Sequence, residues 1–212
     1  YNDNFFMELD YTARRNLELT ETMRSKEKKG SLLWVLDHTN TSMGKRLLKS
    51  YIEQPLVKLA IITNRLDAVE QFCRKSVLRQ QLSDALSKVY DIERLMTRIM
   101  YKTATPRDVK SLSLTALQLP EIKKILGEFS SKLLTELNSK IDTLEDISGL
   151  VERAIVDEPP ITAKEGGVIK DGFNAELDNL RHIISGGKDI IDDIEQRERD
   201  KTGIKNLKIG YN

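Results

Sequence analysis

The C-terminal part of the chain contains one long helix whose two ends are both specified by the sequence. Asn174 is a suitable N-cap, and acidic residues in the first turn and basic residues in the last turn complement the helix dipole. Gly203 follows the last helical residue, where a left-handed backbone often ends a helix. About 28 residues with a rise of ~1.5 Å each give a rod of roughly 42 Å. Because this length exceeds the width of a small domain, the helix must project from the rest of the chain.

The apolar residues of this helix have the spacing of a narrow seam that packs against one partner helix. The seam consists of Leu177, Leu180, Ile184, Gly187, Ile191 and Ile194. Gly186 and Gly187 lie in mid-helix, where each glycine costs about 1 kcal/mol relative to alanine, so we expect a bend or a close helix approach there. Between residues 176 and 201 the helix carries eight acidic and five basic residues, which disfavours DNA binding along its length.

Most of the remaining chain also shows helical spacing of its apolar residues, and it has only 11 glycines and 5 prolines in 212 residues. Thr41 or Ser42 can cap one helix, which must end before Pro55. Thr105 and Asp108 fit a capping box at the start of another helix. We therefore predict a mainly α fold, an elongated helical bundle with a long projecting helix and one or two short strands at the ends.

Two terminal segments alternate apolar and polar residues, as strands do. One covers residues 5–10, and the other contains Leu207, Ile209 and Tyr211. The C-terminal strand has no ladder partner and the helix seam has no returning helix, so we expect the sequence to be a piece of a longer protein. The Pro- and Gly-rich stretch between residues 157 and 172 is the natural boundary. We expect a helical core over residues 1–165, a connector and long helix over 166–201, and the first strand of a further module over 202–212.

Charge and composition exclude several classes of protein. The chain has 34 basic and 33 acidic residues, so it has no overall field that would attract nucleic acid. No apolar run approaches the ~20 residues that span a bilayer, and the N-terminus lacks the features of a signal peptide. With one cysteine the chain cannot form an internal disulfide. These observations predict a soluble protein of a reducing compartment with no membrane contact.

Side chains that could carry chemistry are few. Asp189, Asp192 and Asp193 share one helical face and could bind a metal, but a solvated acidic face is the better interpretation because further ligands at matching spacing are missing. His38 and His182 are the only histidines, and neither belongs to a zinc-binding pattern. We predict no catalytic residue, no metal site and no cofactor site in this sequence, and we keep a carboxylate hydrolase only as a remote alternative.

Three further features have simple structural interpretations. Cys73 lies on an apolar helical stripe and is predicted to be a buried small hydrophobe. Trp34 lies among leucines and valine and is predicted to anchor a core, not to stack on bases. The basic run over residues 24–30 could touch phosphate, but a solvated turn is preferred.

Seven segments, in order along the chain, closely resemble the core or lever region of the bacterial MutS mismatch-repair family. They are RRNLEL (14–19), LLWVLDHTNTSMGKRLLKSYIEQPL (32–56), RLDAVEQF (65–72), DIERLMTRI with TPRDV, LPEIKKIL, AIVDEPPITAKEGGVIKDGFNAELDNLR and ERDKTGIKNLKIGYN. The resemblance covers nearly the whole chain.

The resemblance implies a place in a larger machine. Members of this family are DNA-binding ATPase dimers that encircle mismatched double-stranded DNA, with a clamp at the tip of long helices and a C-terminal ATPase domain. It implies that residues 176–201 form the outgoing arm and residues 204–212 the first strand of the clamp. It also implies ATP and Mg²⁺ for the full-length protein, a homodimer, a MutL-type repair partner, and a bacterial cytoplasmic, nucleoid-associated location. Lys205 and Lys208, at the root of the clamp, become weak, salt-sensitive candidates for DNA binding.

Two family motifs are imitated without their context. The stretch TSMGKR contains Gly44 and Lys45 but lacks the other residues of a phosphate loop, so we expect no ATP binding here. The triplet Phe6, Met7 and Glu8 resembles the family's mismatch-reading motif but directly precedes the lever segments, and we predict a core strand instead.

The helix pattern and the family resemblance lead to two hypotheses about function. The leading hypothesis is a lever region that links the DNA clamp to the ATPase domain without an active site of its own. The alternative is a free-standing helical adaptor that binds a partner through the coiled-coil seam. A gene that continues with a β-rich stretch, a returning helix and a phosphate loop would exclude the adaptor.

Overall fold

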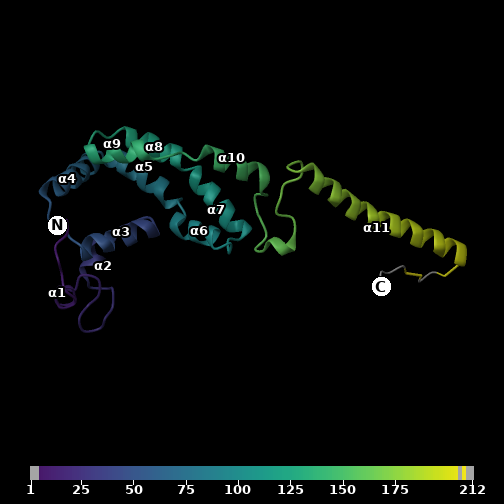
Figure 1. Ribbon diagram of the computed structural model, residues 1–212, viewed down its shortest axis with the longest axis horizontal. Helices are drawn as coiled ribbons and strands as arrows, with labels where there is room; N and C mark the ends of the chain where they lie inside the picture. Colours follow the sequence, from purple (N-terminus) through teal and green to yellow (C-terminus); the bar gives the residue numbers. More distant parts are fainter. Residues whose placement is uncertain (1–4, 205–206, 209–212) are drawn as a thin grey trace.

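The computed structural model describes residues 5–204 and 207–208, apart from the side chains of residues 188–190. The molecule is elongated, with a small N-terminal unit, a helical body and one long projecting helix (Figure 1). The N-terminal unit contains α1 (Tyr11–Asn16), α2 (Leu32–Leu36) and α3 (Ser42–Glu53). The body contains α4 (Leu59–Arg74), α5 (Ser76–Ser87), α6 (Ile92–Met100), α7 (Pro106–Ala116), α8 (Leu119–Gly127), α9 (Lys132–Lys140) and α10 (Glu145–Ala154). A connector over residues 155–174, which includes the short 3₁₀ helix η1 (Ala163–Glu165), leads to α11 (Ala175–Thr202), which we call the arm.

The main apolar core lies where α4, α5, α8 and α9 pack together. Apolar residues three and four positions apart share one face of each helix, and these faces meet in the core. The buried members are Ala68, Leu82, Ala85, Ile122, Ile125, Leu126, Phe129 and Leu134. The ring of Phe129 packs on that of Phe72 with 4.8 Å between the centroids. This cluster anchors the body.

A second, smaller core joins the body to the connector. Helix α10 packs against α7, and Val151, Ala154 and Ile155 form the buried cluster. Val109 from α7 and Val168 from the connector pack against this cluster. The connector is therefore fixed to the body by apolar contacts from both sides of its loop.

The predicted helix starts are confirmed. The Asp108 backbone N–H donates to Thr105 Oγ1 at 3.2 Å, and the Thr105 N–H donates to Asp108 Oδ2 at 2.9 Å, which completes the capping box of α7. Thr41 caps α3 by accepting from the Gly44 N–H at 3.0 Å, and α3 ends at Glu53. The mainly α fold with a projecting helix is confirmed as well.

The two predicted terminal strands are not formed in the described residues. Residues 5–10 form one isolated antiparallel bridge, between Phe6 and Leu56. Most of the C-terminal strand lies outside the described residues, and Leu207 and Lys208 are not in a strand. The alternation at the N-terminus therefore gives one bridged pair and no ladder among the described residues.

Two predictions of buried side chains are wrong. Trp34 is 48 % exposed because α2 is one short turn and buries Leu33 instead. Cys73 is exposed because the buried face of α4 runs through Ala68 and Phe72, and the next residue points away from that face. An apolar stripe read from sequence does not say which edge of the stripe faces solvent.

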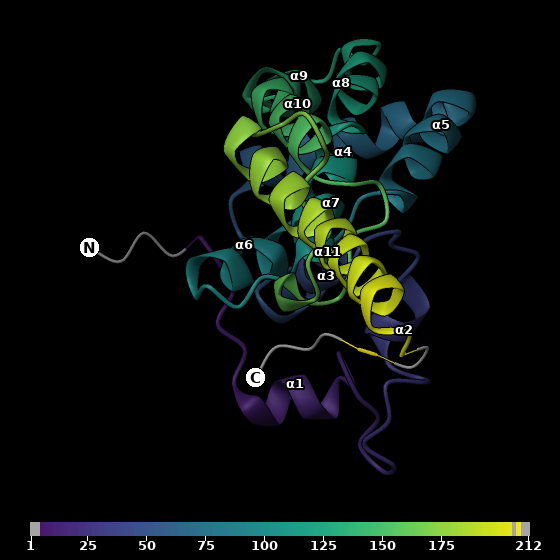
Figure 2. The same ribbon diagram turned by 90° about the vertical axis from the view of Figure 1, so that its right-hand side faces the viewer.

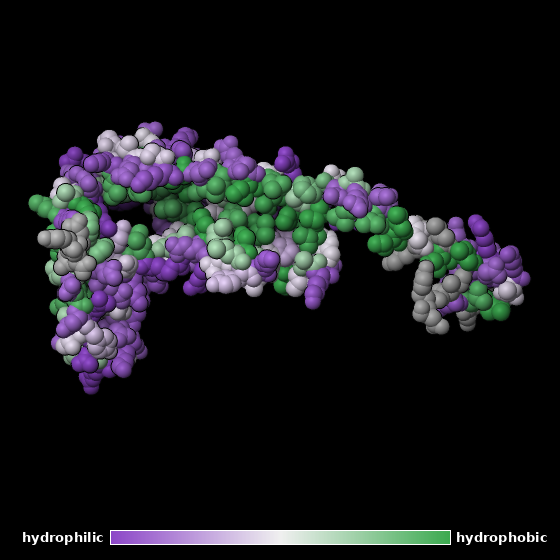
Figure 3. Space-filling view, in the orientation of Figure 1, coloured by the Kyte–Doolittle hydropathy of each residue, from purple (hydrophilic) through white to green (hydrophobic). Residues whose placement is uncertain are grey.

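The N-terminal unit is attached to the body mainly by polar contacts. Arg46 on α3 donates to both carboxylate oxygens of Asp91, at 2.7 and 2.8 Å, and also pairs with Glu93. The Asn40 amide donates to Ser83 Oγ at 2.8 Å. The space-filling view shows a hollow between this unit and the body (Figure 3). The Arg46 ion pairs therefore connect the N-terminal unit to the body across a place where apolar side chains do not fill the space between them.

We expect acid to weaken this bridge. The hydrogen bonds from Arg46 lower the pKa of Asp91 from 3.8 to about 2. Since the folded-state pKa is below the unfolded value, the pair stabilises the folded chain above pH 3.8 and loses this contribution as the pH falls towards 2. We expect Asp91→Asn to lower the free energy of unfolding by about 1 kcal/mol at neutral pH and by much less in strong acid.

Urea unfolding at neutral pH and in strong acid measures how much Asp91→Asn lowers the free energy of unfolding under each condition. The exposed Asp67, substituted as Asp67→Asn, is the matched control, because it removes the same charge from a solvent-exposed side chain. An equal loss for Asp91→Asn at the two pH values would contradict the role of the Arg46 pair.

Candidate functional site at the base of the arm

The arm has the caps that the sequence predicts. Asn174 Oδ1 accepts from the Leu177 N–H at 2.9 Å, and Gly203 adopts the left-handed conformation with φ of 72°. The Gly203 N–H donates to the Arg199 carbonyl at 2.8 Å and closes the last turn. The helix is continuous over 28 residues. Each end is thus capped by a residue adjacent to the helix.

No described helix packs along the arm (Figures 1 and 2). Its seam residues Leu180, Ile184 and Ile194 are 50 %, 69 % and 44 % exposed. A Cβ added at Gly186 or Gly187 would meet no atom within 4 Å. The close helix approach expected at these glycines is therefore absent from the described structure, and the helix continues through them.

The connector returns to the body beside the end of α10. Ile155 and Ile169 form an antiparallel bridge. The Val156 N–H donates to the Val168 carbonyl at 3.0 Å, and the Lys170 N–H donates to the Ala154 carbonyl at 2.8 Å. These bonds hold the two ends of the connector loop together, so residue 170 is fixed to the body only a few residues before the arm begins.

A network of charged side chains also holds the connector against α7 and α10. Lys110 Nζ on α7, which is buried, donates to Glu152 Oε1 at 2.8 Å and to Asp157 Oδ1 at 3.2 Å. Lys170 Nζ donates to the same Asp157 oxygen at 3.2 Å and to the Glu152 carbonyl at 2.9 Å. Two lysines and two carboxylates therefore tie α7, α10 and the connector together.

The electrostatics of the network favour its charged form. Burial acts to lower the pKa of Lys110, but the hydrogen bonds to Glu152 and Asp157 outweigh it and hold that pKa above its ordinary value. The hydrogen bond from Lys110 lowers the pKa of Glu152, and bonds from Lys110 and Lys170 lower the pKa of Asp157. These shifts keep Lys110, Glu152 and Asp157 in their charged forms at neutral pH.

The first turns of the arm reach back to the connector through a second polar cluster. Arg181 Nη2 donates to the Ile169 carbonyl at 3.0 Å, and its Nη1 binds the Asp171 carboxylate. Asp178 Oδ2 accepts from the Gly172 N–H at 2.9 Å. Gly172 has φ of 84°, a conformation that favours glycine. We call residues 169–181 the elbow.

Only one of the two predicted DNA-binding residues belongs to the described part of the chain, so their DNA binding stays a prediction. Lys208 is exposed, and Lys205 lies outside the described residues. Of the acidic cluster, Asp192 and Asp193 are exposed, while the side chain of Asp189 lies outside the description. Within the described residues no group of three or more His, Cys, Asp or Glu side chains could hold a metal ion. In that same part of the chain, no helix is long and apolar enough to cross a membrane.

The two imitated motifs have structural roles. Gly44 lies in the first turn of α3, where a Cβ would come within 3.0 Å of Thr41 Oγ1, and Lys45 faces Asp37 at 3.6 Å. This stretch caps a helix, and its residues do not fit a phosphate cradle. Phe6 and Met7 are 47 % and 50 % exposed, so the predicted core strand is wrong.

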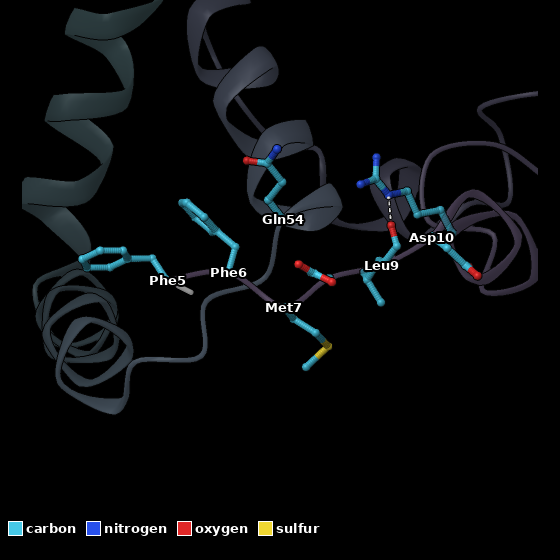
Figure 4. A pocket seen from close by; sticks show the side chains of 8 residues that line it. Phe5, Phe6, Met7, Leu9, Asp10 and Gln54 are labelled. Atoms are coloured by element: carbon cyan, nitrogen blue, oxygen red, sulfur yellow. Dashed lines mark hydrogen bonds between the residues drawn. The ribbon is translucent and has the colours of Figure 1, made fainter. Parts of the chain in front are cut away.

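The N-terminal triplet instead lines an open hollow of about 460 Å³ (Figure 4). The hollow extends from Phe5 to Asp10 and includes Gln54 at the end of α3. Arg14 Nε donates to the Leu9 carbonyl at 2.9 Å along its wall. These contacts are local, and they bring no acid, base or nucleophile together in a catalytic arrangement.

Residues 12–207 match the family model described as MutS domain III. The chain belongs to the MutS family. It is 51 % identical over 207 residues, 98 % of the chain, to the DNA mismatch repair protein MutS of Ruminiclostridium cellulolyticum. It is 49 % identical over 212 residues to the MutS of Acetivibrio thermocellus and 50 % identical over 212 residues to that of Caldanaerobacter subterraneus subsp. tengcongensis, in both cases over the whole chain.

The chain spans about a quarter of the length of these MutS relatives, 24 % in each of the three. It thus corresponds to one region of a MutS protein, and the match to domain III confirms the family resemblance inferred from the seven segments. The match by itself assigns no residue of the elbow a role.

Sequence reasoning missed both polar clusters at the base of the arm. Lys110 gave a weak signal, because it is the one cation in α7 after the first turn and stands beside the apolar Val109 and Leu112. Its partners Glu152 and Asp157 are 42 and 47 residues away, so only the fold pairs them. Nothing in the sequence indicated a role for Arg181, because it is one of many charged residues in a helix predicted to be solvated.

Proposed function

We propose that this chain is the lever region of a DNA mismatch-recognition ATPase, linking a DNA clamp to the ATPase domain without a catalytic site of its own. The observation that carries the proposal is the arm, a helix of 28 residues that no described helix packs along and that is joined to the body, in the part of the chain that the structure describes, through the elbow. A rotation at the base of a rod of roughly 42 Å is magnified at its tip.

The division of labour follows from this proposal. In it, residues 1–165 are the core of the lever, residues 166–201 complete the connector and make up nearly all of the arm, and residues 202–212 become the first strand of the clamp when the full-length protein supplies a partner strand. Lys205 and Lys208 contribute a small, salt-sensitive contact with the DNA backbone. The mismatch itself is bound by other domains of the full-length protein, which acts as a homodimer in the bacterial cytoplasm with a MutL-type partner.

ATP and Mg²⁺ belong to the full-length protein and not to this region. The stretch around Gly44 and Lys45 caps α3, and its backbone N–H at Gly44 is already bound to Thr41. This chain therefore contributes to the ATPase cycle by moving, and it holds no nucleotide.

The proposal is tested by measuring arm movement in the full-length parent protein. Fluorescent labels at Lys124 on α8 and at Asp193 on the arm, both exposed, should change their energy transfer when ATP is added to the DNA-bound protein. A control pair at Lys124 and Thr135, both in the body, should not change. A constant signal from the first pair in a protein that hydrolyses ATP and binds mismatched DNA would overturn the lever function.

The exposed seam of the arm supports one alternative, a helical adaptor that binds a partner coiled coil through Leu180, Ile184 and Ile194. The same measurement separates the two functions. A lever responds to nucleotide in the parent protein, whereas an adaptor seam responds to its partner and is indifferent to nucleotide.

A further inference from the structure

The arm is oriented by few interactions, and most of them are polar. Arg181 lies two turns into the arm and binds backwards to the Ile169 carbonyl and the Asp171 carboxylate. Asp178 holds the Gly172 N–H from the same helical face, and it lies 3.8 Å from Arg181 Nη1. Both acceptors of Arg181 come from the connector. The guanidinium therefore fixes the direction in which the helix leaves the body.

The side of the elbow away from this cluster is open. A hollow of about 380 Å³ lies between the connector and the arm, lined by Ile169, Phe173, Leu177 and Leu180 among others. Phe173 and Leu180 remain 43 % and 50 % exposed there. A turn of the arm towards this hollow would bury apolar surface while the polar contacts on the other face were released.

The body side of the elbow does not share this freedom. Lys170 is bound to Asp157 and to the Glu152 carbonyl, and its own N–H is bound to the Ala154 carbonyl. Rotation is thereby confined to residues 171–174, the short stretch between Lys170 and the start of the helix. Gly172, with φ of 84°, lies in the middle of that stretch.

We propose that Arg181 is a reversible latch that sets the angle of the arm, and that its release lets the arm turn about residues 171–174 towards the apolar hollow. The proposal rests on the lever function for its significance, because the angle matters only if the arm transmits movement. The latch is a positioning device, since Arg181 contacts no ligand.

The latch is weak enough to open. The Asp171 side chain is 91 % exposed and that of Arg181 is 32 % exposed, so solvent and salt screen their attraction. At 1 M salt the Debye length is about 3 Å, and little of the charge attraction remains. The bond to the Ile169 carbonyl is more sheltered and persists when the Asp171 carboxylate is removed.

Double electron–electron resonance on the 212-residue chain tests the latch. Spin labels replace Lys124 and Asp193 in a chain that also carries Cys73→Ser. We expect the distance distribution of Arg181→Gln to be roughly twofold broader than that of the otherwise unchanged chain, with a shift of its mean. Asp171→Asn should broaden the distribution less, because the Ile169 carbonyl still binds Arg181. Arg181→Lys keeps the positive charge, so its distribution should be narrower than that of Arg181→Gln.

Arg197→Gln is the matched control, because Arg197 is exposed on the same helix and lies beyond the elbow. It should leave the distribution unchanged. Salt at 1 M should broaden the distribution of the unchanged chain towards that of Arg181→Gln and affect the variant itself little. This salt measurement needs no substitution at Arg181, so it decides the matter even if Arg181→Gln lowers the helix content measured by circular dichroism.

Identical distributions for Arg181→Gln and the unchanged chain, or a distribution insensitive to salt, would overturn the latch. This outcome is independent of the lever function, because no nucleotide or DNA is present. Conversely, if the energy transfer between positions 124 and 193 of the full-length parent does not change when ATP is added, the lever function is overturned and the latch is unaffected.

Discussion

Replacing Phe129 with alanine is expected to lower the free energy of unfolding of the body by about 3–5 kcal/mol. Phe129 is 5 % exposed and lies where α4, α8 and α9 meet, with its ring against Phe72. The substitution removes the apolar surface of one ring and the contact between two rings, and the surrounding helices can close the cavity only in part. Denaturant unfolding followed by far-UV circular dichroism measures the loss.

Phe173→Ala is the matched control for this experiment. It removes the same ring from a position that is 43 % exposed, at the open side of the elbow. We expect a loss several times smaller, because the ring leaves mostly water and no cavity forms. Equal losses at the two positions would mean that the body has no tightly packed core around Phe129.

The substitution Gly187→Pro is expected to break the arm. Proline removes the backbone N–H at position 187 and places its ring against the carbonyl of Ile183, which costs about 3 kcal/mol or more inside a helix. The arm has no described neighbouring helix that could compensate for this cost. Hydrogen exchange should therefore show faster exchange from residue 187 to the end of the arm, with the body unchanged.

Gly187→Ala at the same position should have the opposite effect. A Cβ there meets no atom within 4 Å, so alanine adds helix propensity without a clash and should stabilise the arm by about 0.5–1 kcal/mol. In the full-length parent, the proline variant should lose mismatch repair and the alanine variant should keep it. Full repair activity in Gly187→Pro would contradict an arm that must be continuous to function.

The sequence allowed good prediction of features that depend on neighbouring residues. The caps at Asn174, Gly203 and Thr105 were all predicted, because a cap is formed by side chains and N–H groups within a few residues of each other. The length of the arm followed from its two caps. The family resemblance rested on whole segments and was likewise confirmed.

Features that depend on distant contacts could not be predicted. Trp34 and Cys73 were expected to be buried on the strength of apolar neighbours, yet both are exposed, since exposure depends on which elements pack over a helix. The network around Lys110 joins residues more than 40 positions apart. The elbow could not be predicted for a related reason. The partners of Arg181 are connector residues, and they come within its reach only because of the path of the connector, which the periodicity of apolar residues does not reveal.

The polar attachment of the N-terminal unit has a mechanical consequence. A force applied at the tip of α11 passes through the connector into α10 and α7, which share apolar contacts with it, and from there into α8, which α7 contacts. It does not have to pass through α1, α2 or α3, which are joined to the body through Arg46 and a few other contacts. Strain on the arm is therefore borne by one half of the molecule, and whatever is joined to the other half can shift without tilting the arm.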